Sequence, residues 1–191
     1  MYRHFFKRLF GFLGALIAIL LLSPLFIVVT IWLHFANKGA GAFFYQTRIG
    51  KGEKPFKVFK FKSMTDERDE NGNLLPDAQR LTKAGKFVRS TSIDELPQFF
   101  NILKGDMSIV GNRPLPLYEA EKLTVDSSID RFMAPAGLTG LWQVEERGKG
   151  GMMSAEERKQ LDITYGQTYS FTMDMKIIFR TLTAFIQKDN V

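Results

Sequence analysis

A long uncharged segment near the N-terminus constrains this chain more than any other feature. Residues 9–37 carry no Asp, Glu, Lys or Arg and are mostly aliphatic or aromatic. The run from Leu9 to Leu33 exceeds the roughly 20 residues that a straight helix needs to span a bilayer. A cleaved signal peptide would have an apolar region of only about 7–15 residues and a small-residue cleavage site, which is absent here. The segment therefore predicts a membrane helix.

Two features of this segment bear on how the helix lies in the membrane. Ser23-Pro24 lies near its middle, where a proline removes a backbone donor and kinks the helix. Both flanks are basic, whereas a spanning helix normally has unequal positive charge on its two sides. Equal flanks favour a re-entrant helix that enters and leaves on the cytoplasmic face, with a kinked spanning helix as the alternative. We expect residues 1–38 to form this helix, kinked at Ser23 and Pro24, and residues 39–191 to form a cytoplasmic, membrane-associated domain.

The distribution of charge agrees with a membrane surface. The net charge is +6 at pH 7. Residues 1–62 hold ten Lys or Arg and one acid, whereas residues 63–191 hold sixteen Lys or Arg and nineteen acids. Cations beside an apolar segment are attracted to anionic headgroups by about 1 kcal/mol each. No nucleic-acid motif is present, so we expect membrane lipids as partners and no nucleic acid. The absence of cysteine excludes disulfides and thiol catalysis.

The rest of the chain predicts an α+β fold. The aromatic-rich segments Ala42–Arg48 and Phe56–Lys62 predict a β-hairpin with a long turn. Helical patterns occur in Glu95–Lys104, in Ser154–Tyr165 and in Asp174–Lys188. The apolar residues of the last segment predict a helix that lies either in the membrane interface or against the protein core. We expect one mostly helical domain with a small hairpin, plus the re-entrant membrane helix and interfacial amphipathic helices.

Two adjacent carboxylates, Asp94 and Glu95, mark the candidate site. They lie at the start of a predicted helix, but the position of that start is ambiguous. Ser92 and Glu95 match a capping box, which would place Pro97 inside the helix. If Pro97 is instead the first helical residue, both carboxylates precede the helix. In either arrangement the positive end of the helix favours an ionised Asp94 and attracts phosphate.

These carboxylates have a structural and a catalytic interpretation. As a structural feature they cap a helix. As a catalytic pair, one would act as nucleophile or metal ligand while the other positions the metal or manages a proton. Hard cations such as Mg²⁺ prefer oxygen ligands and are often shared with substrate phosphates. Basic residues that suit phosphate contacts, although each is singly more often a solvated surface charge, are Lys60, Lys62, Arg89, Arg113 and Arg147.

Six ordered segments together resemble the bacterial sugar transferase family, the monotopic phosphoglycosyl transferases. The segments are Phe44–Gly50, Lys60–Met64, Arg80–Arg89, Ser92–Gln98, Leu103–Pro114 and Gly137–Val144. The resemblance runs from the membrane helix almost to the C-terminus. It implies the small form of the family, which consists of the membrane helix and the catalytic domain.

The resemblance implies a reaction and a location. A sugar-1-phosphate moves from a UDP-sugar donor to polyprenyl (undecaprenyl) phosphate and UMP is released, which starts the assembly of a lipid-linked glycan such as an exopolysaccharide. The enzyme would lie on the cytoplasmic face of the bacterial inner membrane, where a re-entrant helix broken at Ser-Pro is the family's membrane mode. Downstream glycosyltransferases become candidate partners.

The resemblance also assigns roles to residues. Asp94 would attack the β-phosphorus and form a covalent phosphosugar-aspartyl intermediate, with Glu95 supporting it. Mg²⁺ would be required, with Asp94 as its ligand. The residues that the resemblance and the basic pattern place at the substrate are Lys60, Arg89, Arg113, Arg147 and Asp162.

Three positions depart from the family's commonest pattern. Lys62 stands where many members have arginine, and Asn112 replaces the first proline of the usual Pro-Arg-Pro. The second change is expected to loosen the segment that holds Arg113. Glu145-Glu146-Arg147 differs from the frequent Asn-Gly-Arg. The rival from another class is a catalytically silent membrane-anchored interaction module in which Asp94 and Glu95 only cap a helix, and a metal-dependent phosphatase is a second rival.

Overall fold

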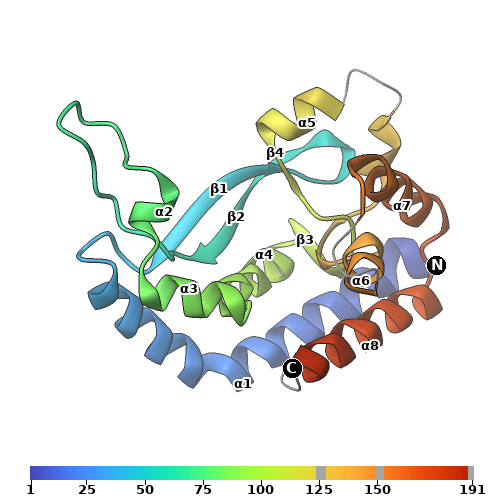
Figure 1. The fold of residues 1–191 in the computed structure, drawn as a ribbon. Helices are drawn as coiled ribbons and strands as arrows, with labels where there is room; N and C mark the ends of the chain where they lie inside the picture. Colours follow the sequence, from blue (N-terminus) through green and yellow to red (C-terminus); the bar gives the residue numbers. More distant parts are fainter. Residues whose placement is uncertain (124–127, 149–152, 189–191) are drawn as a thin grey trace.

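The computed structural model combines many helices with two small sheets (Figure 1). It describes residues 1–123, 128–148 and 153–188, without the side chains of residues 121–123, 128–129, 147–148 and 185–188. The mixture of helix and small sheets confirms the predicted class in its coarse form.

The N-terminal helix α1 (Lys7–Ala36) follows a π-helical turn, η1 (Tyr2–Phe6). Within the described residues, the helical stretch Tyr2–Ala36 is long and apolar enough to cross a membrane, and an 18-residue window in it has a mean hydropathy of 2.8. Pro24 lies inside α1, and Figure 1 shows that the helix bends near its middle. A proline inside a helix removes one backbone hydrogen bond, which accounts for a bend there.

The first half of α1 packs against the rest of the molecule. Ala15 is fully buried in a core cluster that includes Ile102 of α4 (Gln98–Lys104). The guanidinium of Arg8 donates to the carbonyls of Ile102 and Leu103 in the last turn of α4. A cation bonded to the last carbonyls of a helix stabilises that terminus.

The second half of α1 packs against the same body. Val29 and Leu33 are buried with Phe61 and with Val88 of α3 (Lys83–Ser90). Just after the helix, the amide of Asn37 donates to the carbonyl of Lys62 at 2.7 Å. The other face of α1 leaves large apolar side chains exposed: Leu9, Phe10, Phe12, Leu13, Leu16, Ile17, Leu20, Leu21, Leu25, Ile27, Val28, Ile31, Trp32 and Phe35. The helix therefore lies along the body with one face covered and one face bare.

The predicted hairpin is confirmed. Strands β1 (Phe43–Ile49) and β2 (Pro55–Phe61) pair antiparallel, with Phe44 opposite Lys60. A short 3₁₀ turn, η2 (Lys51–Glu53), connects them. The two-residue strand β4 (Leu115–Pro116) pairs with the other edge of β1, which makes the order β2-β1-β4.

A second sheet consists of the parallel strands β3 (Met107–Val110) and β5 (Ala136–Thr139). The backbones approach so closely beyond β3 that a Cβ on Gly137 would lie 2.2 Å from the nitrogen of Gly111. Only glycine fits such a contact. The Gly-rich segments around residues 111 and 137 are therefore explained by backbone packing.

Helices surround the sheets. The remaining elements are α2 (Asp77–Arg80), η3 (Ile93–Glu95), α5 (Leu117–Leu123), η4 (Ser128–Met133), α6 (Leu141–Gly148), α7 (Ala155–Thr168) and α8 (Phe171–Lys188). The helix predicted in Ser154–Tyr165 is confirmed as α7, and Ser154 and Glu157 form a complete capping box at its start.

The start of the helix after Asp94 differs from one of its two predicted forms. The capping box of Ser92 with Glu95 is wrong: Ser92 has a φ of 60°, and its side chain makes no capping hydrogen bond. Instead Asp94 and Glu95 lie in the 3₁₀ turn η3, and Pro97 directly precedes α4. This is close to the alternative in which both carboxylates come before the helix.

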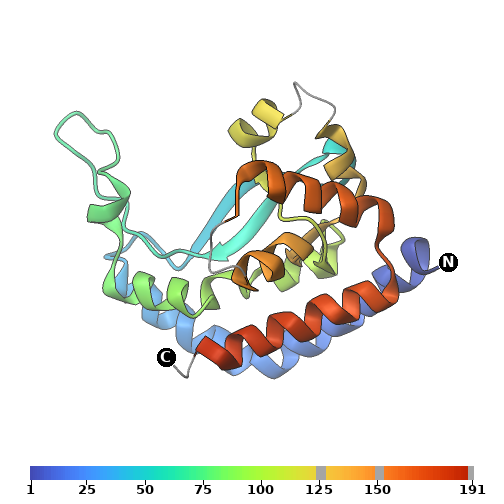
Figure 2. The same ribbon diagram turned by 45° about the vertical axis from the view of Figure 1, so that its right-hand side comes forward.

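The C-terminal helix α8 runs beside α1 in both views (Figures 1 and 2). Ile177 is buried against Tyr165. Much of the apolar face predicted for this helix points away from the protein core, because Met175, Phe179 and Leu182 are exposed. Phe185 and Ile186, which belong to the same predicted face, lie outside the described side chains.

A buried ion pair joins the first turns of α1 and α8. Lys7 donates to Asp174, and their side chains are only 6% and 3% exposed. The hydroxyls of Tyr2 and Tyr165 also donate to Asp174, and Lys7 donates to the Tyr165 hydroxyl at 2.9 Å. These bonds satisfy both oxygens of the carboxylate, which a buried ion pair requires to be stable. We name these four residues the junction cluster.

Candidate active site

A cavity of about 1010 Å³ opens between the hairpin, η3, α1 and α8. Its charged lining consists of Arg48, Lys60, Lys62, Asp66, Asp77, Arg80, Arg89, Asp94, Glu95 and Arg113. Its apolar lining includes Leu22 of α1 and Ile178 and Leu182 of α8, besides Phe44, Phe99, Ile109 and Leu138. One cavity thus combines a cluster of charges with side chains from the two apolar helices.

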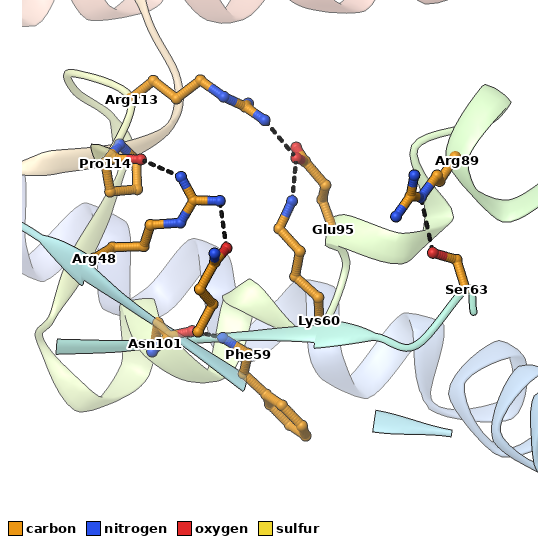
Figure 3. A network of polar contacts seen from close by, with 10 residues as sticks. Arg48, Phe59, Lys60, Ser63, Arg89, Glu95, Asn101, Arg113 and Pro114 are labelled. Atoms are coloured by element: carbon orange, nitrogen blue, oxygen red, sulfur yellow. Dashed lines mark hydrogen bonds and ion pairs between the residues drawn. The ribbon is translucent and has the colours of Figure 1, made fainter. Parts of the chain in front are cut away.

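Glu95 collects two cations from distant parts of the chain (Figure 3). Its Oε1 accepts from Lys60 Nζ at 2.7 Å and from Arg113 Nη2 at 3.1 Å. Lys60 comes from β2, and Arg113 from the segment between β3 and β4. Burial raises the pKa of Glu95, but the charges of Arg113 and Lys60 outweigh burial and hold that pKa below its usual range. Glu95 is therefore an ionised anchor for two cationic side chains that line the cavity.

Asp94 is different from its neighbour. Within the described residues, it has no ion-pair partner within 4.0 Å. Burial raises the pKa of its carboxyl above the ordinary value, and the charge of Glu95 adds to this shift. Lys60 and Arg89 lower the pKa and offset the shift in part. A half-buried carboxylate that no cation neutralises directly keeps its lone pairs free, as a nucleophile or a metal ligand requires.

Two further cations of the lining have neutral partners. Arg89 donates from Nε to the hydroxyl of Ser63 at 2.8 Å. Arg48 donates to the side-chain oxygen of Gln46 at 2.6 Å and to the carbonyl of Pro114 at 3.4 Å. Arg48 was not among the predicted site residues. Its signal was the spacing of Phe44, Gln46 and Arg48, since alternate residues of a strand share one face.

The structure brings together Lys60, Arg89, Asp94, Glu95 and Arg113 around one cavity, as predicted. Ser23 and Pro24 lie in α1 next to Leu22, which lines the cavity, so the predicted kink is adjacent to the site. Arg147 has its backbone in α6, but its side chain lies outside the described residues.

Asp162 does not join the other site residues. Its side chain is 1% exposed, pairs with Arg131 and is absent from the cavity lining. Burial raises the pKa of Asp162, and Arg131 opposes this effect. A fully buried pair of this kind has no route to a substrate in the cavity. The sequence could not reveal this, because Arg131 and Asp162 are 31 residues apart.

The segment around Arg113 is held more firmly than its sequence suggests. The amide of Asn112 donates to the carbonyls of Arg131 and Asp162, at 2.6 and 2.9 Å. Asn112 is itself buried. These two hydrogen bonds hold the residue before Arg113 in place, where the usual proline would restrict the backbone. Lys62, the other departure, donates to Asp66 at 2.5 Å and remains in the lining.

The residues fit one kind of metal site. Within the described residues, no group of three or more His, Cys, Asp or Glu could hold a metal ion. Glu95 already accepts from two cations, which leaves Asp94 as the available carboxylate. Mg²⁺ commonly binds one or two carboxylates and completes its coordination with water and substrate phosphates. An ion shared with substrate fits this site, whereas a cage of protein ligands does not.

Comparisons with known proteins match this chain to one family. The family model described as "Bacterial sugar transferase" matches residues 2–188. The uncharacterized sugar transferase EpsL of Bacillus subtilis is 42% identical over 185 residues, which cover 97% of this chain and 89% of EpsL. The exopolysaccharide production protein ExoY of Rhizobium meliloti is 35% identical over 195 residues, covering 93% of this chain and 84% of ExoY.

A longer relative carries a more specific name. The UDP-glucose:undecaprenyl-phosphate glucose-1-phosphate transferase of Klebsiella pneumoniae is 38% identical over 190 residues. The match covers 96% of this chain but only 41% of that protein. The chain therefore spans most of some relatives and less than half of others.

Proposed function

The chain belongs to the bacterial sugar transferase family, and we propose that it transfers a sugar-1-phosphate from a UDP-sugar to polyprenyl phosphate, releasing UMP. The observation that carries this proposal is the carboxylate of Asp94, which has no ion-pair partner within the described residues, in a cavity lined by both cationic and apolar side chains. The cations suit a nucleoside diphosphate sugar, and the apolar side chains suit a lipid chain. Relatives named for transfer to undecaprenyl phosphate support the same reaction.

The proposed mechanism has two displacements at one phosphorus. A carboxylate oxygen of Asp94 attacks the β-phosphorus of the donor. The bond from that phosphorus to the bridging oxygen breaks, and UMP leaves with the electron pair. An oxygen of polyprenyl phosphate then attacks the phosphorus of the phosphosugar-aspartyl intermediate, and the aspartyl oxygen leaves as a carboxylate. Covalent catalysis of this kind divides one difficult transfer into two easier steps and predicts ping-pong kinetics.

The neighbouring residues hold the phosphates in place. Glu95 fixes Lys60 and Arg113, whose positive charges face the cavity where phosphate charge develops. Arg89 provides a further cation near Asp94. Mg²⁺, with Asp94 as its protein ligand, would neutralise charge on the phosphates when bound.

The packing of α1 supports a re-entrant helix at the cytoplasmic face of the inner membrane. Both halves of α1 contact the same body, whereas the ends of a spanning helix are separated by a hydrocarbon core about 30 Å thick. The bare faces of α1 and α8 would then contact lipid. The product would pass to downstream glycosyltransferases that extend the glycan.

Labelling of introduced cysteines tests this membrane disposition. The chain has no cysteine, so the variants Phe5→Cys and Ala40→Cys each carry a single thiol. In oriented membrane vesicles, an impermeant maleimide should label both variants from the same side. Labelling from opposite sides would establish a spanning helix instead.

Intact-protein mass spectrometry tests the reaction. The full chain is incubated with Mg²⁺ and a panel of UDP-sugars, without lipid acceptor. We expect UMP release and a mass gain equal to one phosphosugar, with the Asp94→Asn variant showing neither. Turnover with acceptor but no adduct would indicate direct transfer. A chain that binds partners but turns over none of the donors would be the silent membrane-anchored module.

A further inference from the structure

The cations of the cavity differ in how their charge is balanced. Lys60 and Arg113 pair with Glu95, Lys62 pairs with Asp66, and Arg80 pairs with Asp77. In the part of the chain that the structure describes, Arg48 and Arg89 have no carboxylate within 4.0 Å. Their charges are thus available to an anionic ligand.

Arg48 lies beside a second guanidinium. Its Nη1 points to the carbonyl of Pro114, the residue that follows Arg113, and both arginines line the cavity. Burial lowers the pKa of Arg48 and the like charge of Arg113 lowers it further, while Glu119, Tyr118 and Glu95 oppose this shift in part. Two like charges in a half-buried position repel each other unless an anion lies between them. Gln46 meanwhile orients the Arg48 fork without neutralising it.

The two arginines that lack a carboxylate within 4.0 Å lie on opposite sides of Glu95. In Figure 3, Arg48 and Arg113 lie on one side of Glu95, and Arg89 lies on the other. Arg89 belongs to α3, which packs on α1 through Val88 and through Phe87 against Trp32. Arg48 pairs with Pro116 of β4, which lies with α5 on the side away from α1 and α8 (Figures 1 and 2). Arg89 thus belongs to an element that packs on α1, whereas Arg48 belongs to a strand that pairs with β4 on the other side of the molecule.

We propose that Arg48 and Arg113 together bind the diphosphate of the nucleotide donor, and that Arg89 binds the phosphate of the lipid acceptor. This inference rests on the proposed function. A soluble nucleotide reaches the cavity from water, whereas the phosphate of a membrane lipid stays close to the headgroups. When the bond from the β-phosphorus to the bridging oxygen breaks, that oxygen keeps the electron pair. A pair of guanidinium groups stabilises the charge that accumulates on it.

Kinetics with each substrate varied in turn test the assignment. The variants are Arg48→Ala and Arg48→Lys, with Lys57→Ala as a control that removes one positive charge from an exposed position on the neighbouring strand. We expect Arg48→Ala to lower kcat/KM for the UDP-sugar about tenfold or more, the usual effect of losing a charge-assisted contact. Arg48→Lys should lower kcat/KM less than Arg48→Ala does, because lysine keeps the positive charge but lacks the planar guanidinium that can form two parallel hydrogen bonds. kcat/KM for polyprenyl phosphate should change less than about twofold in each variant.

Direct binding gives a second readout that does not need turnover. Calorimetric titration with UDP and Mg²⁺ should show binding to the wild-type chain and to Lys57→Ala, and about tenfold weaker binding to Arg48→Ala. If Arg48→Ala has a lower thermal unfolding midpoint, Arg48→Lys decides the test.

Two results would overturn the inference. An equal loss in kcat/KM for both substrates would place Arg48 at a shared position, and unchanged UDP binding in both Arg48 variants would remove it from the donor site. Failure of the proposed function is a separate result. In that case the wild-type chain turns over no UDP-sugar, while UDP binding still reports whether Arg48 and Arg113 form a nucleotide subsite.

Discussion

The junction cluster and the cavity both contain carboxylates beside cations, but they differ in how completely the charges are paired. In the junction cluster, Asp174 accepts from Lys7, Tyr2 and Tyr165, and almost none of its surface reaches solvent. In the cavity, Asp94 has no ion-pair partner within the described residues, and Arg48 has neutral partners only. The charges of the junction cluster are fully paired within the protein, whereas the cavity keeps charged groups that a ligand can pair with.

This difference separates structural from functional charge. A buried charge that is fully bonded holds two helices in register and has nothing left to offer a substrate. Charges that remain unpaired in a cavity raise the energy of the free protein and are expected where a ligand supplies the missing partner. The pair of Arg131 and Asp162 is as deeply buried as the junction cluster and lies outside the cavity lining, but it is less completely bonded, since Oδ1 of Asp162 has no hydrogen-bond partner within the described residues.

Replacing Asp94 should have the largest effect on activity. Asp94→Asn is expected to lower the rate of UMP release about a thousandfold or more, because an amide cannot replace a nucleophilic carboxylate. The thermal unfolding midpoint should stay unchanged or rise at neutral pH. Since folding raises the pKa of Asp94, its ionised form is the one that the folded state disfavours.

The exposed residue Glu53 provides a control for this substitution. Glu53→Gln should leave UMP release and the unfolding midpoint unchanged. Near-normal turnover of Asp94→Asn would remove the nucleophile assignment and, with it, the comparison drawn above.

Replacing Asp174 should have the largest effect on stability. Asp174→Asn places amide donors against Lys7 and leaves that charge buried without a carboxylate, which typically costs about 3–5 kcal/mol. Denaturant or thermal unfolding of the detergent-solubilised chain measures the change. Glu67→Gln removes the exposed partner of Lys38 and should cost less than about 1 kcal/mol. Equal effects of the two substitutions would show that the junction cluster is not buried as described.

The pH dependence of the first half-reaction should show a smaller effect. Asp94 acts as a nucleophile only when ionised, so the rate should fall as pH falls through its pKa. Since burial raises that pKa in the metal-free protein, the acidic limb measured at subsaturating Mg²⁺ should lie above the ordinary aspartate value of about 3.9.

Single-turnover adduct formation without acceptor is the appropriate measurement, because a phosphate monoester itself titrates near a pH of about 6. An acidic limb at or below the ordinary value would mean that Asp94 is well solvated. It would then lack the burial that distinguishes it from a surface carboxylate.

Local signals predicted much of the fold. The apolar run predicted α1, the aromatic segments predicted the hairpin, and Ser154 with Glu157 form a capping box at the start of α7. The same local reading failed at Ser92. The Ser-x-x-Glu spacing fits a capping box, but the left-handed backbone at Ser92 prevents it. A cap depends on backbone angles that a four-residue spacing does not specify.

The candidate site was predicted in its carboxylates and in most of its cations. Asp94, Glu95, Lys60, Arg89 and Arg113 were found from residue type and resemblance, and the structure brings them to one cavity. Arg48 was not predicted as a site residue, and Asp162 was predicted at the substrate but does not line the cavity. Whether a charged side chain lines a cavity or closes a buried pair depends on partners far away in the chain, and no spacing rule covers that choice.

The sequence by itself determined that this protein has a long apolar helix near its N-terminus, a hairpin and two adjacent carboxylates before a short helix, because each of these depends on neighbouring residues. Only the tertiary structure decided which charges are satisfied. Lys7 meets Asp174 across 167 residues, and Lys60 meets Glu95 across 35. Such pairs form when distant elements pack together. A fully buried charge must be paired within the protein, whereas a charge that lines an open cavity can be paired by a ligand.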